Sequence, residues 1–343
     1  MASQTLSILG FASKINMPDT LLEISNLRTY FFTEAGVVKA VDGVSIDVKP
    51  GETTGLVGES GSGKSVTAQS ALRIVPRPGK IVDGSITFDG EDLLAKSEEE
   101  MRKYRGPKIA MVFQDPTTSL NPVYTVEKQL ADIIMLHKSA TKAEASKSAL
   151  SLLEMVKISE PKKRLKTYPH ELSGGMKQRI AIARALSCEP RLLFADEPTT
   201  NLDVTIQAQV LELLKQLQRD LGMAMVMITH DMGIIADMTQ RVTILYAGKV
   251  MEVADTRSIF TGPRHPYTEA LLKAVPSVAQ TRALEVIPGN IPNLIEPPAG
   301  CVFHPRCKYT KDICMKEVPA LERSEEGHYV ACHRWRELKL TGK

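Results

Sequence analysis

A glycine-rich turn between two regular segments constrains the fold of this chain more than any other feature. Residues 58–65 read GESGSGKS, which fits the pattern G-x-x-x-x-G-K-[S/T], and an apolar segment ending at Val57 precedes them. Glycines at these positions let backbone N–H groups turn inward around phosphate oxygens, while Lys64 reaches terminal phosphates and the Ser65 hydroxyl binds Mg²⁺. A flexible Gly/Ser turn is the alternative, but the flanking strand and helix favour a phosphate-binding loop. The expected phosphate-binding residues are Gly58, Glu59, Ser60, Gly61, Ser62, Gly63, Lys64, Ser65 and Val66.

Short apolar runs alternate with amphipathic stretches through the first 262 residues. We expect strands at 21–24, 44–48, 55–57, 192–195 and 224–228, and helices at 140–156 and 204–221. Within 204–221, the apolar residues Val210, Leu213, Leu214 and Leu217 repeat at helical spacing. A helix between two apolar strands is typical of a parallel crossover, so the sequence predicts an α/β fold with a parallel core.

Bulk composition excludes several classes of protein. The chain is 43% hydrophobic and 24% charged with a net charge of +3, which is typical of a folded domain and gives no basic excess for binding nucleic acid. No stretch approaches the roughly 18 apolar residues that a membrane-spanning helix needs. Residues 1–16 lack a basic start and a cleavage site, so we interpret them as a loose arm or a remnant of cloning. We therefore expect a cytoplasmic protein.

Two carboxylates follow the apolar run 192–195. Asp196 and Glu197 would lie at the carboxyl end of a buried strand, where open α/β sheets bind ligands. Such a pair is often structural when it stands alone, but a phosphate-binding loop upstream favours a catalytic role. We expect Asp196 to hold Mg²⁺ and Glu197 to polarise an attacking water.

A second anion site is indicated at the start of another helix. Residues 172–179 read LSGGMKQR and precede the helix-forming run 180–186. A hydroxyl and two glycines at a helix N-terminus leave free N–H groups facing outward. An ordinary serine cap is the alternative, but it leaves a second phosphate site in the same chain unexplained.

These motifs resemble the ABC-type nucleotide-binding domain, whose signature is LSGGMKQR, from about Leu21 to Glu252. The resemblance implies a P-loop NTPase with a RecA-like core, an antiparallel β subdomain and a helical subdomain at about 115–185, within a domain spanning 17–262. It also implies that two such domains face each other head to tail and hydrolyse ATP bound between them. Ser173, Gly174 and Gly175 would then contact the nucleotide held by the partner's P-loop.

The resemblance assigns further residues one by one. Gln114 resembles the glutamine that contacts Mg²⁺ and water and senses the membrane subunit, and His230 resembles the histidine that contacts the γ-phosphate. Asp203 resembles the aspartate that couples the two sites, although Asn201 stands where a small residue is usual and puts this coupling in doubt.

An aromatic side chain near the N-terminus is expected to stack on adenine. Phe31 has the best spacing, with Tyr30 and Phe32 as rivals, and simple strand packing is an equally weighted alternative for each. Val66 departs from the family pattern, which often has a second hydroxyl, so only its backbone N–H could contact the α-phosphate.

Two stretches, 113–122 (FQDPTTSLNP) and 265–268 (HPYT), resemble the dipeptide and oligopeptide permease ATPases. This resemblance implies the motor of an importer at the cytoplasmic face of the membrane. Its partners would be a second ATPase, related or identical, two transmembrane permease subunits and, indirectly, an extracytoplasmic solute-binding protein, without nucleic acid. A nickel or other solute importer of the same branch is an alternative. A soluble ABC ATPase acting on nucleic acid or ribosomes, or a regulatory module without hydrolysis, agrees less well with the motifs.

The last 81 residues, 263–343, differ in character from the rest. They contain nine prolines and four of the five cysteines, spaced Cys301-x5-Cys307-x6-Cys314-x17-Cys332. The prolines interrupt regular structure too often for this appendage to form a large apolar core of its own. We therefore expect it to be stabilised by packing against the ATPase domain, by a metal centre or by both. Disulfides are disfavoured in the cytosol, and zinc sites usually have C-x2-C pairs.

The cysteine spacing resembles the C-terminal motif of peptide-importer ATPases, which implies a [4Fe-4S] cluster held by all four cysteines. Zinc and free thiols remain alternatives, and His304, His328 and His333 are alternative ligands. Cys188 stands apart and is expected to be a small buried hydrophobic residue.

Overall fold

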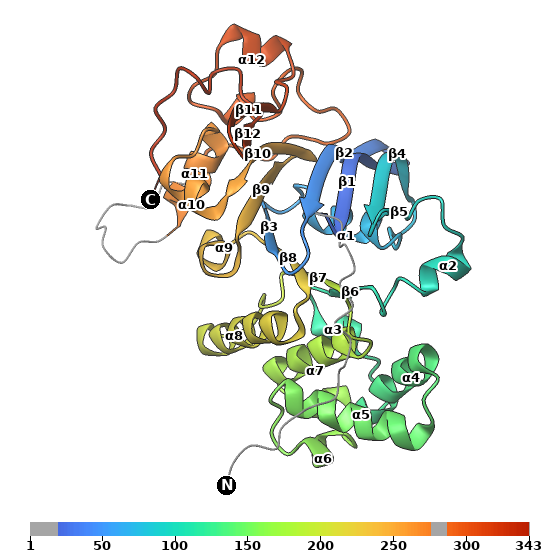
Figure 1. Cartoon of the computed structure of the whole chain (residues 1–343). Helices are drawn as coiled ribbons and strands as arrows, with labels where there is room; N and C mark the ends of the chain where they lie inside the picture. Colours follow the sequence, from blue (N-terminus) through green and yellow to red (C-terminus); the bar gives the residue numbers. More distant parts are fainter. Residues whose placement is uncertain (1–19, 276–286, 343) are drawn as a thin grey trace.

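An eight-stranded sheet contains the strand that precedes the glycine-rich turn. The computed structural model describes residues 20–275 and 287–342 (Figure 1), so the arm expected at 1–16 lies outside the described residues. The strands, in spatial order, are β11 (Glu322–Glu325), β12 (His328–Val330), β10 (Lys249–Asp255), β9 (Arg241–Tyr246), β3 (Thr53–Val57), β8 (Ala224–Thr229), β7 (Leu192–Asp196) and β6 (Ile109–Val112).

The middle of this sheet is parallel, which confirms the predicted α/β fold. β3 pairs in parallel with β8 and β9, and β7 pairs in parallel with β6 and β8. The expected crossover helix is α8 (Val204–Leu221), whose buried residues are the four predicted ones, Val210, Leu213, Leu214 and Leu217. Parallel pairing brings the carboxyl ends of β3, β6, β7 and β8 to one edge of the sheet.

A second, antiparallel sheet lies beside the first. Its order is β2 (Gly36–Val48), β1 (Leu22–Thr33), β4 (Gly79–Phe88) and β5 (Glu91–Asp92). The expected early strands at 21–24 and 44–48 belong to β1 and β2, which are both longer than predicted. Helix α1 (Lys64–Ala71) contributes Ala68 and Ala71 to the core that these strands share with Leu56 and Phe194 of the large sheet.

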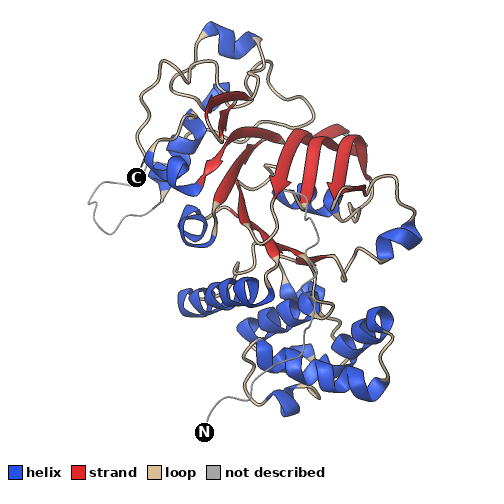
Figure 2. Ribbon diagram, in the orientation of Figure 1, coloured by secondary structure: helices blue, strands red, loops and turns tan. Residues whose placement is uncertain are grey.

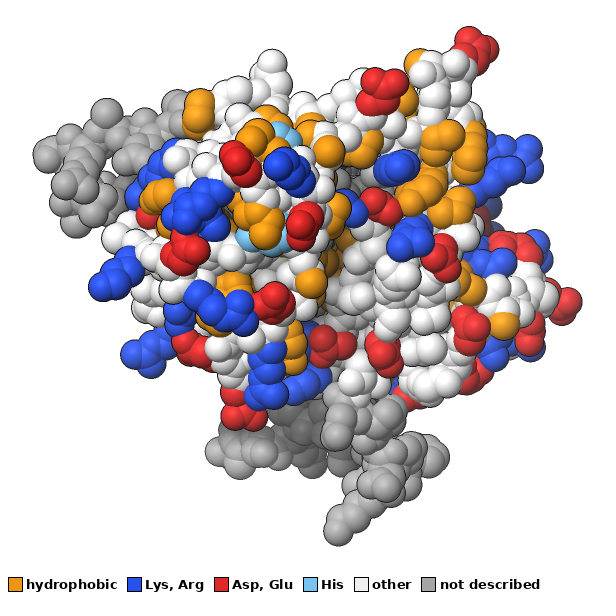
Figure 3. Space-filling model, turned by 90° about the horizontal axis from the view of Figure 1, so that it is seen from above, with side chains coloured by type: hydrophobic (Ala, Val, Ile, Leu, Met, Phe, Trp, Pro, Cys, Tyr) orange, Lys and Arg blue, Asp and Glu red, His pale blue; other side chains and the backbone are white. Residues whose placement is uncertain are grey.

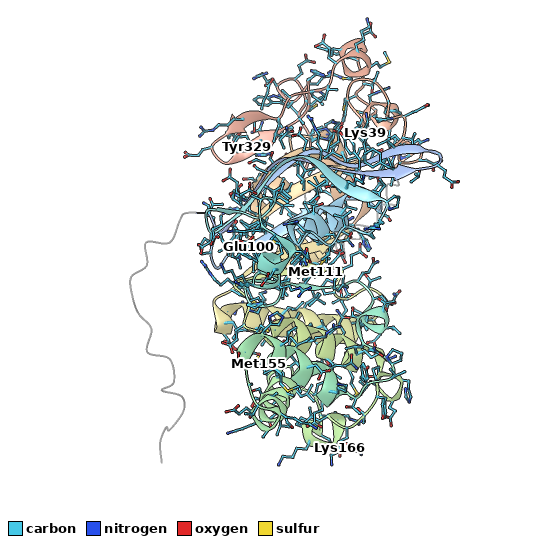
Figure 4. The ribbon with its side chains drawn as sticks, turned by 90° about the vertical axis from the view of Figure 1, so that its right-hand side faces the viewer. Lys39, Glu100, Met111, Met155, Lys166 and Tyr329 are labelled. Carbon is cyan, nitrogen blue, oxygen red and sulfur yellow. The ribbon has the colours of Figure 1, made fainter. Side chains whose placement is uncertain are left out.

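A group of helices forms the end of the molecule opposite to β11 and β12 (Figure 1 and Figure 2). They are α3 (Pro116–Ser119), α4 (Val126–Lys138), α5 (Lys142–Met155), α6 (Pro161–Arg164) and α7 (Gly174–Leu186), with the 3-10 helix η1 (Pro169–Glu171). Helix α5 starts two residues after the expected 140 because Thr141 caps it, with Glu144 completing a capping box. Lys166 marks the far tip of this helical part, and Tyr329 lies towards the other end of the molecule (Figure 4).

The remaining helices are α2 (Glu98–Arg102), α9 (Met232–Met238), α10 (Thr256–Thr261), α11 (Pro266–Ala274), η2 (His304–Arg306) and α12 (Asp312–Lys316). Among the described residues, no helix combines the length and the apolar character needed to cross a membrane.

The C-terminal appendage packs against the rest of the protein, as its composition predicts. Strand β12 pairs with β10 and so extends the central sheet. Phe303 is 2% exposed and its ring packs 5.2 Å from those of Tyr246 and Tyr267. The fully buried Glu252 carboxylate on β10 also accepts a hydrogen bond from His328 Nε2 on β12, over 2.7 Å.

Candidate nucleotide-binding site

The glycine-rich turn lies in a pocket of about 990 Å³ at the carboxyl edge of the parallel strands. This volume suits a nucleotide-sized ligand. The pocket is lined by Gly58, Glu59, Ser60, Gly61, Ser62, Gly63, Lys64, Ser65, Val66, Gln114, Glu197, Thr200, His230, Leu271, Ala274, Ile287 and Ile291. Every residue of the predicted phosphate-binding loop is therefore part of one pocket.

Glycine is required at two positions of the loop. A Cβ at Gly58 would lie 2.1 Å from the Leu245 carbonyl oxygen, which belongs to the neighbouring strand. Gly63 has φ +100°, and its Cβ would lie 2.4 Å from the Ala40 carbonyl oxygen. The loop thus passes so close to the surrounding backbone that no side chain fits at either position.

Lys64, Ser65 and Asp196 lie together at the base of the pocket. The Lys64 ammonium donates to the carbonyl oxygens of Gly58 (2.7 Å) and Glu59 (3.0 Å), and burial lowers its pKa. The Ser65 hydroxyl donates to Asp196 Oδ1 over 3.0 Å, although the two residues are far apart in sequence. Burial raises the pKa of Asp196 to about 6. A hydroxyl and a carboxylate side by side are the oxygen ligands that Mg²⁺ prefers.

Glu197 is the centre of a cluster of polar side chains. Its carboxylate accepts from Gln114 Nε2 at 2.9 Å and from the Thr200 hydroxyl at 3.0 Å, and His230 Nδ1 lies 3.1 Å away. Its backbone has φ +43°, in the left-handed region that a non-glycine residue seldom adopts. This conformation directs the residue after β7 into the pocket, where the carboxylate can orient a water molecule.

The signature residues lie away from the pocket of their own chain. Ser173 caps α7 by accepting from the Met176 N–H (3.4 Å), and a Cβ at Gly175 would lie 2.6 Å from the Ile206 side chain. Ser173, Gly174 and Gly175 do not line the pocket. Asp203 caps α8 by accepting a hydrogen bond from the Ile206 N–H (3.0 Å). This capping contact lies within one chain, and the expected coupling of two sites by Asp203 stays a prediction.

Phe31 lies outside the pocket lining, although the sequence placed it on adenine. Its ring packs against the Gly79 backbone so closely that a Cβ there would lie 2.8 Å from Phe31 Cε1. This contact matches the alternative prediction of strand packing. Tyr30 donates to Asp42 (2.8 Å), and Phe32 is 44% exposed.

Sequence reasoning missed a group of pocket residues from the C-terminal side. Leu271, Ala274, Ile287 and Ile291 form an apolar wall, and Thr200 donates to the Glu197 carboxylate. The HPYT stretch was the only signal, since it begins α11, which carries two of these residues.

All four appendage cysteines line a second pocket of about 20 Å³ with His304 and His333. Burial raises the pKa of the Cys301 thiol to about 11 and that of the Cys332 thiol to about 12. It also raises the pKa of the Cys307 thiol. Among the described residues, no three His, Cys, Asp or Glu side chains converge closely enough to hold one metal ion.

His328 and Cys188 both lie outside the lining of the cysteine pocket. His328 is engaged with Glu252 and does not line the cysteine pocket, so it is wrong as an alternative ligand. Cys188 is 8% exposed, which confirms it as a buried residue.

Comparison with known families agrees with this geometry. A family model described as ABC transporter matches residues 41–200, and one described as oligopeptide/dipeptide transporter, C-terminal region, matches residues 251–314. The chain is 48% identical to a probable peptide ABC transporter ATP-binding protein of Sinorhizobium fredii, over 93% of this chain and 96% of the relative. It is 46% identical to the dipeptide transport ATP-binding protein DppD of Escherichia coli K12 (91% and 96%) and 47% identical to the oligopeptide transport ATP-binding protein OppD of the same strain (92% and 94%).

Solved structures give the same result for the fold. A dimeric ATP-binding cassette in a post-hydrolysis state with ADP and Pi is 29% identical and superposes with a TM-score of 0.62, over 69% of this chain and 99% of that chain. The cassette cbiO1 of Clostridium perfringens superposes with a TM-score of 0.61 at 28% identity, over 71% and 91%. The chain is an ABC-type ATPase and belongs to the ATP-binding proteins of ABC transporters, in the group with the oligopeptide/dipeptide transporter C-terminal region.

Proposed function

We propose that this chain is the ATP-hydrolysing motor subunit of an importer for dipeptides or oligopeptides. One observation carries the proposal: the carboxyl ends of β3, β6, β7 and β8 bring the P-loop, Gln114, Asp196, Glu197 and His230 to one site. The relatives whose names specify dipeptide and oligopeptide transport support the substrate class.

The chemistry follows from the contacts around the P-loop. Lys64 and the loop N–H groups would bind the phosphates of ATP, while Ser65 and Asp196, 3.0 Å apart, would hold Mg²⁺ with Gln114. Glu197 would orient and polarise the attacking water, and His230, 3.1 Å from that carboxylate, would contact the γ-phosphate. The direct hydrogen bonds of Glu197 to Gln114 and His230 keep the catalytic carboxylate aligned.

We infer that the site is completed by a second ATPase subunit, related or identical. Ser173, Gly174 and Gly175 lie at the exposed start of α7, where helix N–H groups can bind the phosphates of the partner's ATP. Asp203 begins α8 next to them and couples the two sites.

The surface near Gln114 suits the permease subunits. A groove between β6 and the helical part is lined by Met111, Phe113, Ile133, His137 and Arg184, among others. The helical part also carries exposed apolar side chains, with Val123 70% and Leu136 76% exposed. An apolar, partly basic groove beside a catalytic loop can transmit ATP binding to a membrane subunit, which keeps the chain at the cytoplasmic face of the membrane. The solute-binding protein acts indirectly, through the permease.

The face of the molecule drawn in Figure 3 gives no support for the rival function on nucleic acid. Lys and Arg alternate with Asp and Glu on the face seen from above, without a broad basic area (Figure 3). Binding of a phosphate backbone depends on such an area.

We propose that residues 263–343 are a regulatory and metal-binding unit, distinct from the ATPase domain at 17–262, in which the four cysteines hold a [4Fe-4S] cluster. The observation that supports a shared group is that all four thiols line one pocket. When bound, such a cluster supplies one-electron chemistry and covalent cross-links between loops. The absorbance spectrum and the iron and sulfide content of anaerobically purified protein test this assignment, and a colourless, iron-free, zinc-loaded sample would overturn it.

The transport function is tested with the whole complex. The chain should co-purify from membranes with two hydrophobic subunits, and proteoliposomes containing them should accumulate a labelled dipeptide only with MgATP. Nickel uptake without peptide uptake in the same vesicles would favour the alternative importer. Purification with ribosomes or nucleic acid, without membrane subunits, would refute the importer function.

A further inference from the structure

The first turn of the P-loop is held by an arginine from the cysteine-rich appendage. Arg306 lies on η2, its side chain is 5% exposed, and its Nη1 and Nη2 donate to the two carboxylate oxygens of Glu59 over 2.6 and 3.1 Å. Its Nε also donates to the Pro288 carbonyl oxygen over 2.8 Å. This paired geometry fixes both the charge and the direction of the Glu59 side chain.

A second contact fixes the Glu59 backbone. The Tyr267 hydroxyl accepts a hydrogen bond from the Glu59 N–H over 2.9 Å. Tyr267 is fully buried and its ring packs against those of Tyr246 and Phe303. Both the side chain and the main chain of Glu59 are therefore positioned by residues outside the P-loop.

The position of Glu59 matters because it lines the nucleotide pocket. Its carbonyl oxygen accepts from the Lys64 ammonium over 3.0 Å, in the loop that binds phosphates. A carboxylate in such a loop repels the triphosphate unless a cation neutralises it and holds it aside. Arg306 does not line the pocket, so it acts on the nucleotide through Glu59.

We propose that Arg306 and Tyr267 are positioning residues for ATP, which hold Glu59 so that its charge is neutralised and its backbone keeps the P-loop open to phosphate. The inference rests on the proposed ATP-binding function and makes the appendage part of the ATP site. Arg306 directly precedes Cys307, so the segment that presents two of the pocket cysteines also positions the P-loop.

Affinity for a fluorescent ATP analogue tests the role of the charge. Arg306→Gln leaves Glu59 unpaired, and we expect about tenfold weaker binding, equivalent to about 1.4 kcal/mol. In the double variant Glu59→Gln/Arg306→Gln no unpaired carboxylate remains, so its affinity should return to within about threefold of Glu59→Gln alone. Arg306→Lys keeps the charge but loses the paired geometry, and should lie between wild type and Arg306→Gln.

Controls separate positioning from general damage. Arg264→Gln removes an arginine that pairs with Glu325 in the same region, away from the P-loop, and should bind the analogue within about twofold of wild type. Thermal unfolding of each variant reports whether it folds. The proposal is refuted if Arg306→Gln binds the analogue as tightly as wild type. It is also refuted if the double variant binds as weakly as Arg306→Gln, because removing the Glu59 charge would then not restore the affinity.

The backbone contact and the cysteine link have separate readouts. Tyr267→Phe removes only the acceptor, and we expect KM for MgATP to rise about three- to fivefold with kcat little changed. Cys307→Ser should weaken analogue binding in wild type but not further in the Glu59→Gln/Arg306→Gln background, and equal losses in both would overturn the link. Hydrolysis by the unaltered chain, and its loss in Glu197→Gln, reports on the proposed function independently of these affinities.

Discussion

Replacing Glu252 by alanine should detach the appendage from the central sheet more than any exposed substitution. The Glu252 carboxylate is fully buried on β10 and accepts three hydrogen bonds, from the N–H groups of Arg264 (2.6 Å) and His265 (3.0 Å) and from His328 Nε2 (2.7 Å). Alanine leaves all three donors without this acceptor in a place that water does not reach.

The cost follows from these orphaned groups. Each buried donor left unsatisfied costs about 1–3 kcal/mol, and Glu252→Ala leaves three donors without their acceptor. We expect the free energy of unfolding to fall by about 4 kcal/mol. With an m-value of about 2–3 kcal/mol per molar urea, the midpoint falls by about 1–2 M.

The single tryptophan makes the assay specific to the appendage. Trp335 lies in the C-terminal region, where its Nε1 donates to Glu322, so its fluorescence reports unfolding there. Glu326→Ala is the control, because Glu326 is an exposed glutamate in the turn between β11 and β12, close in sequence to His328, and its midpoint should change by less than about 0.3 M. A Glu252→Ala midpoint as close to wild type as the control would refute the reasoning.

Three further predictions concern the ATP site. Glu197→Gln should lower kcat at least about a hundredfold while MgATP binding and dimerisation persist, measured by phosphate release and size-exclusion chromatography; wild-type-like turnover would contradict its role. Burial raises the pKa of Asp196 to about 6, and only the ionised carboxylate binds Mg²⁺. The value of kcat/KM for MgATP should therefore fall as the pH drops below about 6. A kcat/KM that stays constant from pH 7 to pH 5 would contradict this. Gly58→Ala places a Cβ 2.1 Å from the Leu245 carbonyl oxygen, so it should destabilise the fold by about 1–3 kcal/mol and weaken ATP binding. Gly61→Ala meets open space and is strained only by the positive φ of that position (+77°), so it should lower the melting temperature less.

Sequence predicted the parts of the site that depend on local chain geometry. The P-loop, Asp196, Glu197 and His230 each follow an apolar strand, and parallel strands must bring their carboxyl ends to one edge. The buried face of α8 was predictable for the same reason, because helical periodicity fixes which residues face the sheet.

The contacts that escaped prediction join residues with no shared local pattern. Arg306 and Glu59 are 247 positions apart, and neither a period nor a motif links them. Thr200 is an ordinary hydroxyl in the sequence and gains meaning only from its 3.0 Å contact with Glu197. The adenine contact of Phe31 stays a prediction: its spacing favours adenine, while in the structure its ring lies beside Gly79, where β1 pairs with β4.

The HPYT stretch shows how a motif without evident chemistry can act on a distant site. His265 caps α11 by accepting from the Tyr267 N–H (3.0 Å), and Pro266 occupies the first turn, where its missing N–H costs nothing. This start fixes the direction in which Tyr267 leaves the helix, towards the Glu59 N–H of the P-loop. Glu252 holds the His265 backbone from the other side. The order of these residues therefore sets the position of the P-loop relative to the appendage, which is why a loss at Glu252 should reach the ATP site as well as the cysteine pocket.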